Sequence, residues 1–258
     1  VSMTEVTFTI PADAKPGKIK VETESGLARS PFSYYDFCGG LITDFDGTTD
    51  IVPQGWNFSG VYSDVDGIFG NYVELKSANP LDANGGWNED YKIDFWCGNW
   101  GGDPMSITSG PGTPICNVID FTNWQSMAFK FELCIPADAP WMSGAIQLVF
   151  CSSDKAANDA WQNNTYIDVA ANGGLDLCRG LYRPWETTGS FDTGGKWITV
   201  TVPFSEFTYN ADGTAGKVPL EKPEDFASFC IWAWSGGVAG TECTPVFRID
   251  NLRVVPVK

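Results

Sequence analysis

Apolar residues alternate with polar ones in several short segments of the chain. The clearest alternation runs through residues 129–135, 145–151, 196–204 and 228–234. A period of two residues is typical of β-strands, whose successive side chains point to opposite faces. In the last segment, SFCIWAW, both faces are apolar. Stretches rich in Gly, Asn, Pro and Ser separate these segments, so we expect long loops between the strands.

The segment VFRIDNLRVV near the end of the chain changes phase part-way. Phe247 and Ile249 occupy odd positions, whereas Leu252 and Val254 occupy even ones. One extra residue at Asp250–Asn251, as in a β-bulge, returns both pairs to the same face. Together these patterns predict an all-β fold class, a jelly-roll-like β-sandwich of two packed antiparallel sheets with loops at its rim.

The first 35 residues form a separate part of the pattern. Val6, Phe8 and Ile10 alternate with threonines, and the segment KIKVET follows after the turn-like ADAKPG. Two strands bury too little surface to form a core. We therefore divide the chain into residues 1–35, the tail of a small β-sandwich, and residues 36–258, a second sandwich. The abrupt start looks like a piece of a longer protein, so the lack of a signal peptide is uninformative.

Charge and composition exclude several classes of function. The formal net charge is −16, which disfavours nucleic acid and anionic lipid as partners. The chain has no histidine, which removes Ser-His and Cys-His catalysis and His-ligated zinc. Its eight cysteines include no C-x-x-C pair, and several lie in apolar strands as small hydrophobes. The sequence leaves their disulfide state open.

Eleven tryptophans are the most unusual count in the composition. A sugar ring presents C–H groups that favour the face of an aromatic ring, and hydroxyls that pair with amides, carboxylates and Arg. The segment NGGWNEDYKIDFWCGNWGGD mixes these residue types, and glycines flank two of its tryptophans. A core strand YKIDFW explains Phe95 but not both of those tryptophans. The candidate glycan-binding residues here are Trp87, Asn88, Glu89, Trp96, Asn99 and Trp100.

Two later segments extend this candidate site. DAWQNNTY contributes Trp161, and CRGLYRPWETT contributes Tyr182, Arg183 and Trp185. A Pro-Trp pair in a loop presents a ring on a restrained backbone, although Trp185 is equally well explained as a lid packed over the sandwich edge.

The other tryptophans have different expected roles. Trp124 and Trp197 come at strand starts, which favours the core or the rim. Trp232 and Trp234 lie two apart on one strand, where they pave a binding face or pack a second core layer.

Three segments resemble the C-terminal, xyloglucan-binding-type domain of surface glycan-binding proteins of gut Bacteroidota. They are LITDFDG, LYRPWETTGSFDTGGKWITVTVPFSEF and FRIDNLRVVP, and residues 1–35 resemble the end of an IPT/TIG immunoglobulin-like domain. The resemblance implies a partial immunoglobulin-like tail followed by a carbohydrate-binding β-sandwich. It also implies a lipoprotein held on the outer membrane at the cell surface. Members bind different glycans, so neither the ligand nor the binding residues carry over.

Three aspartates form the candidate metal site. Asp44 and Asp46 in DFDG and Asp250 in RIDN are hard oxygen ligands near the two ends of the second unit. They suggest a structural Ca²⁺ of the kind jelly-roll sugar binders carry. The alternative is ordinary turn chemistry with an aspartate capping the bulge.

We therefore predict a protein that binds a largely neutral polysaccharide without catalysis and aids its capture for uptake. We expect a monomer that works beside other outer-membrane glycan-uptake proteins and requires no cofactor. One alternative is a jelly-roll glycoside hydrolase or lyase, which needs two facing carboxylates. Another is a structural or adhesive immunoglobulin-like protein, which gains nothing from exposed tryptophan. The sequence identifies neither the polysaccharide nor the part of it that is recognised.

Overall fold

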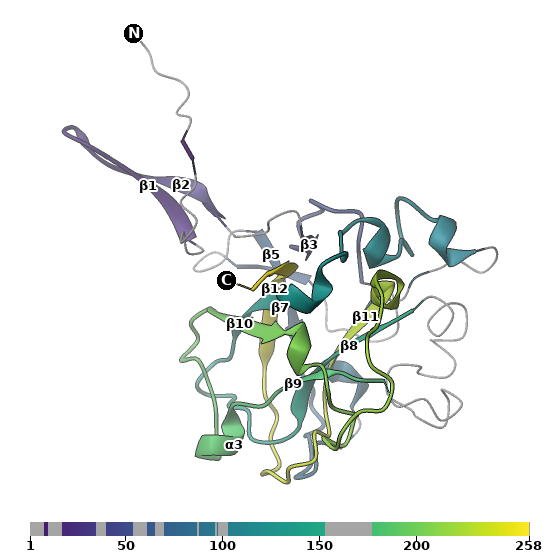
Figure 1. The fold of residues 1–258 in the computed structure, drawn as a ribbon. Coiled ribbons are helices and arrows are strands. Elements are labelled where there is room, and N and C mark those ends of the chain that lie inside the picture. The colour runs from purple at the N-terminus through teal and green to yellow at the C-terminus, as the bar shows by residue number, and fades with distance from the viewer. Residues whose placement is uncertain are drawn as a thin grey trace. The chain divides into compact units, whose positions relative to one another are not determined.

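The computed structural model, drawn in Figure 1, divides into two compact units, Val1–Phe37 and Cys38–Lys258. The structure describes residues 8–9, 17–34, 40–53, 61–64, 70–86, 88–95, 97, 103–152 and 177–257.

The first unit contains an antiparallel hairpin of β1 (Gly17–Thr23) and β2 (Gly26–Tyr34). The Thr23 hydroxyl accepts from the Ser25 N–H at 3.2 Å and donates to the Gly26 carbonyl at 3.3 Å, which closes the turn. The sequence pattern predicts β1 but not β2, because the segment GLARSPFSY lacks an alternation of apolar residues. The expected strand at VTFTI lies almost wholly outside the described residues, and the IPT/TIG assignment stays a prediction.

The second unit is built from two antiparallel sheets. The larger has the order β10-β7-β12-β5-β4, with β3 also paired to β12, and the smaller has the order β6-β11-β8-β9. The strands of the larger sheet are β3 (Leu41–Thr43), β4 (Val61–Asp64), β5 (Gly70–Leu75), β7 (Met127–Cys134), β10 (Ile198–Pro203) and β12 (Phe247–Pro256). Those of the smaller are β6 (Lys92–Phe95), β8 (Ala145–Cys151), β9 (Gly180–Tyr182) and β11 (Ser228–Trp234).

Helical structure is sparse in the described part of the chain. It consists of the one-turn helix α3 (Trp185–Thr188) and of short 3-10 turns. These turns are Glu89–Tyr91, Pro104–Ser106, Ile115–Asn117, Trp124–Ser126, Phe204–Glu206 and Pro223–Phe226. No described helix is long and apolar enough to cross a membrane. The predicted all-β sandwich is confirmed.

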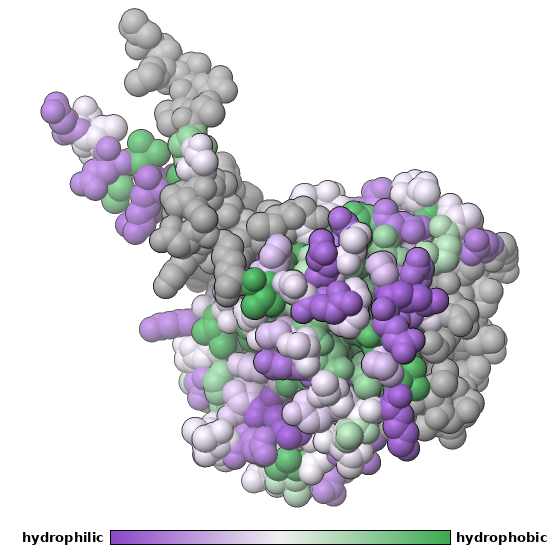
Figure 2. Space-filling model, viewed as in Figure 1, coloured by the Kyte–Doolittle hydropathy of each residue, from purple (hydrophilic) through white to green (hydrophobic). Residues whose placement is uncertain are grey.

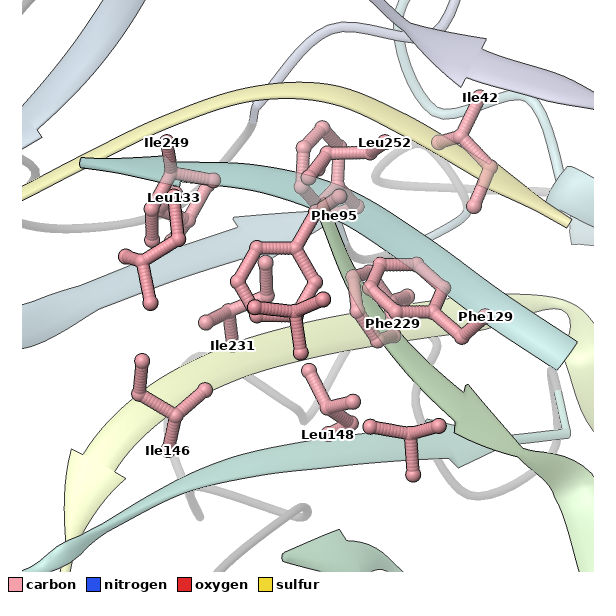
Figure 3. Packing of buried hydrophobic residues seen from close by; sticks show 14 of the residues in the cluster. Ile42, Phe95, Phe129, Leu133, Ile146, Leu148, Phe229, Ile231, Ile249 and Leu252 are labelled. Atoms are coloured by element: carbon pink, nitrogen blue, oxygen red, sulfur yellow. The ribbon is translucent and has the colours of Figure 1, made fainter. Parts of the chain in front are cut away.

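The core lies between the two sheets and is one continuous apolar cluster. Figure 3 shows Phe129 and Leu133 from β7 packed against Leu148 from β8 and Phe229 and Ile231 from β11. The phase read from the sequence is therefore correct for these strands. On β11 the opposite face carries a second, smaller cluster, which explains why both of its faces are apolar.

The predicted bulge in β12 is confirmed. The pairing of β12 with β7 shifts register between Asp250 and Arg253, and Asn251 has a left-handed φ of 52°. The shift lets apolar residues on both sides of it, such as Ile249 and Leu252, enter the same core.

On the face of the molecule shown in Figure 2, hydrophobic residues are scattered among hydrophilic ones.

Candidate functional site

Loops from distant parts of the sequence meet at one end of the second unit. The Gly85 carbonyl accepts from the Ser235 N–H at 2.7 Å, and the Gly240 N–H donates to the Ala83 carbonyl at 2.6 Å. The Thr241 N–H donates to the Met142 carbonyl at 2.9 Å. We call this region the loop end; its described residues are 82–86, 88, 141–144, 183–189, 210–213 and 235–241.

Glycines allow these loops to pack backbone against backbone. A Cβ on Gly85, where φ is +67°, would lie 2.6 Å from the Gly144 Cα. A Cβ on Gly237, where φ is +78°, would lie 2.1 Å from the Asp212 carbonyl oxygen. Both positions combine a left-handed φ with a contact that no side chain tolerates. The loop end is thus held by its own main chain, which limits the motion of side chains mounted on it.

Asn88 and Glu89, two of the predicted site residues, lie at this end. The Asn88 side-chain oxygen accepts from the Asp90 N–H at 3.0 Å and starts the 3-10 turn Glu89–Tyr91. Its amide nitrogen donates to the Asn79 carbonyl at 2.9 Å. Asn88 therefore shapes the loop, while Glu89 is half-buried beside it.

Arg183 joins its own loop to the loop after β11. Its Nη1 donates to the Gly236 carbonyl, and its Nε lies 2.7 Å from the Glu186 carboxylate. Because Ser235 is bonded to Gly85, Arg183 and the Asn88 loop are held on the same end of the sandwich. The described parts of these two loops therefore lie at the same end, while the convergence of the predicted clusters themselves stays a prediction.

Two predicted platforms are not exposed rings. Trp185 is only 3% exposed, packs in the main core and donates from Nε1 to the Gly144 carbonyl at 2.7 Å. The Tyr182 ring lies 6.1 Å from the Trp141 ring and 6.5 Å from the Phe131 ring, and burial raises its pKa. Trp185 is covered by the core, whereas Tyr182 is half-buried against it, so a sugar contact by Tyr182 stays a prediction. The lid interpretation holds for Trp185.

The remaining predicted residues cannot be placed. Trp87, Trp96, Asn99, Trp100 and Trp161 lie outside the described residues. Their role stays a prediction.

The outer face of the smaller sheet is a second core layer. Trp232 is fully buried, and the Lys92 Nζ lies 4.9 Å from its ring centre and 3.4 Å from the Asp94 carboxylate. Burial raises the pKa of Cys230 well above its usual value, since the residue lies in the same cluster. Of the two interpretations of the Trp232 face, packing is therefore the correct one. Trp234 is partly buried at the edge of this cluster.

A buried polar pair that sequence reasoning missed supports the same loops. Arg179 is 1% exposed, and its Nη1 donates to the Gln147 side-chain oxygen at 2.9 Å. The Gln147 amide donates to the carbonyls of Ala211 and Trp234 at 2.9 and 2.7 Å. These bonds anchor the loop at 210–213 to β8 and β11. The signals in the sequence were a lone Gln in an apolar strand and Arg179 in the segment CRGLYRPWETT.

The charges of Asp44 and Asp46 act on Asp250, but the three predicted metal ligands do not form a coordination site. Burial raises the pKa of Asp250 well above its usual range, and Asp46, Asp44 and Glu132 raise it further. The buried Asp250 Oδ2 accepts no hydrogen bond. Asp44 accepts from the Asp46 N–H and the Thr48 hydroxyl. Within the described residues, no three His, Cys, Asp or Glu side chains converge as a metal site does.

Comparison with known proteins identifies the family to which the second unit is related. Residues 34–256 match the family model described as the surface glycan-binding protein B xyloglucan binding domain. The chain belongs to this family. Among solved structures, it is similar to the surface glycan-binding protein PbSGBP-B from Prevotella bryantii, with 31% identity and a TM-score of 0.74. That match covers 97% of this chain and 64% of the Prevotella chain, so the chain spans less than two-thirds of that protein.

Two more distant structures share fewer features. A protein crystallised with a xylogluco-oligosaccharide is 19% identical, with a TM-score of 0.44 over 95% of this chain and 45% of its own. SGBP-B from a complex xyloglucan utilization locus in Bacteroides uniformis is 16% identical, with a TM-score of 0.41 over 97% of this chain and 58% of its own. At these scores neither supports a conclusion here. No curated protein matches the chain.

Membership in the glycan-binding family agrees with the resemblance read from residues 36–258. It does not extend to the first unit, whose relation to IPT/TIG domains rests on the sequence pattern alone.

Proposed function

We propose that this chain binds a largely neutral polysaccharide at the bacterial cell surface and does not cleave it. The observation that carries the proposal is the family match across residues 34–256. The backbone-packed loop end supports it, because rigid loops present side chains at little entropic cost. The net charge of −16 favours a neutral chain there. Xyloglucan, named in the family description, is the first ligand to test.

Four acidic residues, Glu74, Asp94, Glu132 and Glu186, are candidates for the carboxylate pair that a hydrolase would need. Glu74, Asp94, Glu132 and Glu186 each lie within 3.4 Å of a Lys or Arg nitrogen. Burial favours the protonated form of Glu74, but hydrogen bonds from Lys76 and Arg248 leave its pKa lowered. A general acid for glycoside cleavage needs a raised pKa and a second carboxylate across the bond. Ion-paired carboxylates of this kind are structural.

The binding rings we propose are Trp87, Trp96, Trp100 and Trp161, with Asn99 and Glu89 beside them. Arg183 and Asn88 are assigned to shaping the described loops of the loop end. We further propose that the protein is a lipid-anchored monomer that captures polysaccharide for neighbouring outer-membrane uptake proteins.

Affinity electrophoresis tests the proposed function. We expect the protein to be retarded in gels that contain xyloglucan or another neutral polysaccharide, with no reducing sugar released from the same samples. Retardation reflects the stacking and hydrogen bonds of a binding protein. Release of sugar in step with protein concentration would instead establish a hydrolase.

A structural Ca²⁺ held by Asp44, Asp46 and Asp250 is a further part of the proposal. The described side chains do not converge as a ready metal site, and the support for an ion is the partnerless buried Asp250 Oδ2 beside the charges of Asp44 and Asp46, which a cation would offset.

An ion that binds only the folded state raises the melting temperature. We expect excess chelator to lower Tm by several degrees and added Ca²⁺ to restore it. Asp250→Asn should abolish that response. The calcium proposal fails if Tm is unchanged in chelator and elemental analysis finds no metal.

A further inference from the structure

Three aromatic rings form a continuous strip on the outward face of the larger sheet. Tyr62 on β4 and Tyr72 on β5 are direct cross-strand partners, and their ring centres are 6.0 Å apart. The Trp197 ring, from the residue before β10, meets Tyr72 edge-on at 5.5 Å. In the sheet order β12 and β7 lie between β5 and β10, so the strip crosses the sheet. We call Tyr62, Tyr72 and Trp197 the aromatic strip.

An ion triad lies against this strip. Glu74 faces Arg248 across the β5–β12 pairing and accepts from its Nε at 3.0 Å and from the Lys76 Nζ at 2.8 Å. The Lys76 Nζ lies 5.7 Å from the centre of the Tyr62 ring, and the Arg248 guanidinium 5.9 Å from that of Tyr72. Two cations and one carboxylate give the triad a charge of +1, on a chain whose net charge is −16.

Solvent reaches both parts of this surface. Tyr62 is 37% exposed, and the side chains of Lys76 and Arg248 are 55% and 34% exposed. Within the described residues, Arg248 donates side-chain hydrogen bonds only through Nε. Its two terminal nitrogens can therefore donate side by side to the two oxygens of a carboxylate.

Packing alone accounts for part of this arrangement. Tyr72 is almost covered, and its contacts with Trp197 and Arg248 stabilise the sheet. Packing does not account for the exposure of Tyr62 beside a positive, forked donor. A ring that stacks on sugar C–H groups and a guanidinium that takes an acid group occur together where an acidic sugar is recognised.

We propose that the aromatic strip and the ion triad form a second carbohydrate-binding surface, selective for a glycan that carries carboxylate groups. The pyranose face of a uronic acid stacks on Tyr62, and its carboxylate pairs with the terminal nitrogens of Arg248. Lys76 adds positive charge at the same point. This surface shares no residue with the loop end, so the inference does not depend on the neutral polysaccharide proposed there.

The test is a titration with a galacturonic acid oligosaccharide, compared with the same oligosaccharide after its carboxyl groups are reduced. The indole N–H signal of Trp197, assigned from its loss in Trp197→Phe, reports on the strip. We expect the acidic oligosaccharide to shift this signal and to bind about tenfold or more tightly than the reduced one. Binding should weaken as salt is raised, because the contact is charged and exposed.

Two matched pairs of variants assign the contacts. Arg248→Lys keeps the charge and a partner for Glu74 but loses the fork, and Arg248→Gln also loses the charge. Tyr62→Ala removes the exposed ring, and Tyr62→Phe keeps it. We expect Tyr62→Phe to bind as wild type, and Arg248→Lys and Tyr62→Ala to bind the acidic oligosaccharide about tenfold more weakly at unchanged Tm.

Retardation of all four variants by neutral polysaccharide should equal that of wild type, which separates this surface from the loop end. The inference is overturned if the acidic oligosaccharide leaves the Trp197 signal in place. It is equally overturned if the reduced oligosaccharide binds as well as the acidic one, or if Arg248→Lys and Tyr62→Ala bind as wild type.

Discussion

Trp185→Ala should destabilise the second unit by about 3–5 kcal/mol, the range for removing a buried Trp. The ring is 3% exposed, and its N–H is bonded to the Gly144 carbonyl beneath the loop end. Replacement therefore opens a cavity and leaves that carbonyl without its donor. The expected fall in Tm is roughly 10 °C, measured by thermal unfolding followed by circular dichroism.

Trp185→Phe is the control, because it keeps most of the packing and loses only the hydrogen bond. We expect it to lower the free energy of unfolding by about 1–2 kcal/mol less than the alanine variant does. An alanine variant with a wild-type melting curve and weakened glycan binding would return Trp185 to the list of sugar platforms.

Arg253→Met should destabilise the second unit by about 3–5 kcal/mol. Arg253 is fully buried, and its Nη2 lies 2.8 Å from the buried Glu132 carboxylate. Without the guanidinium, Glu132 remains buried as an unpaired charge near Asp250, whose pKa it already raises. Chemical denaturation of the variant and wild type measures the difference.

The double variant Glu132→Leu with Arg253→Met is the matched control. Replacing both partners of a buried pair by apolar side chains is often neutral, because no charge is left uncompensated. We expect it to recover most of the lost stability. A single variant as stable as wild type would show that the ion pair does not hold β7 to β12.

Several strands could be predicted from the sequence because burial of one face of a strand places apolar residues at every second position. That is why the alternation through Phe129 and Leu148 located β7 and β8, and the phase change at Asp250 located the bulge. Strands β3, β4 and β9 were missed, because three or four residues are too few to show a period. Strand β5 has six residues, but its segment GNYVEL does not alternate, because the apolar Tyr72 and Val73 are adjacent. The hairpin strand β2 was missed because its segment lacks apolar alternation.

The site was harder to predict, because a tryptophan beside proline or glycine has the same local sequence whether its ring faces solvent or the core. The burial of Trp185 and Trp232 depends on contacts with residues far away in the chain, such as Gly144 and Lys92. The convergence of the Asn88 and Arg183 loops depends on main-chain bonds between glycine-rich segments. Such bonds leave no side-chain pattern to read.

The central claim is that loop tryptophans bind a polysaccharide that the protein does not cleave. The most direct test runs wild type and Trp87→Ala, Trp96→Ala, Trp100→Ala and Trp161→Ala in the affinity gel that retards wild type best, with Tm measured for each. We predict that at least one variant loses most of its retardation, with binding about tenfold or more weaker and Tm near wild type. Wild-type retardation of all four variants, or loss of binding only where Tm also collapses, would contradict the claim.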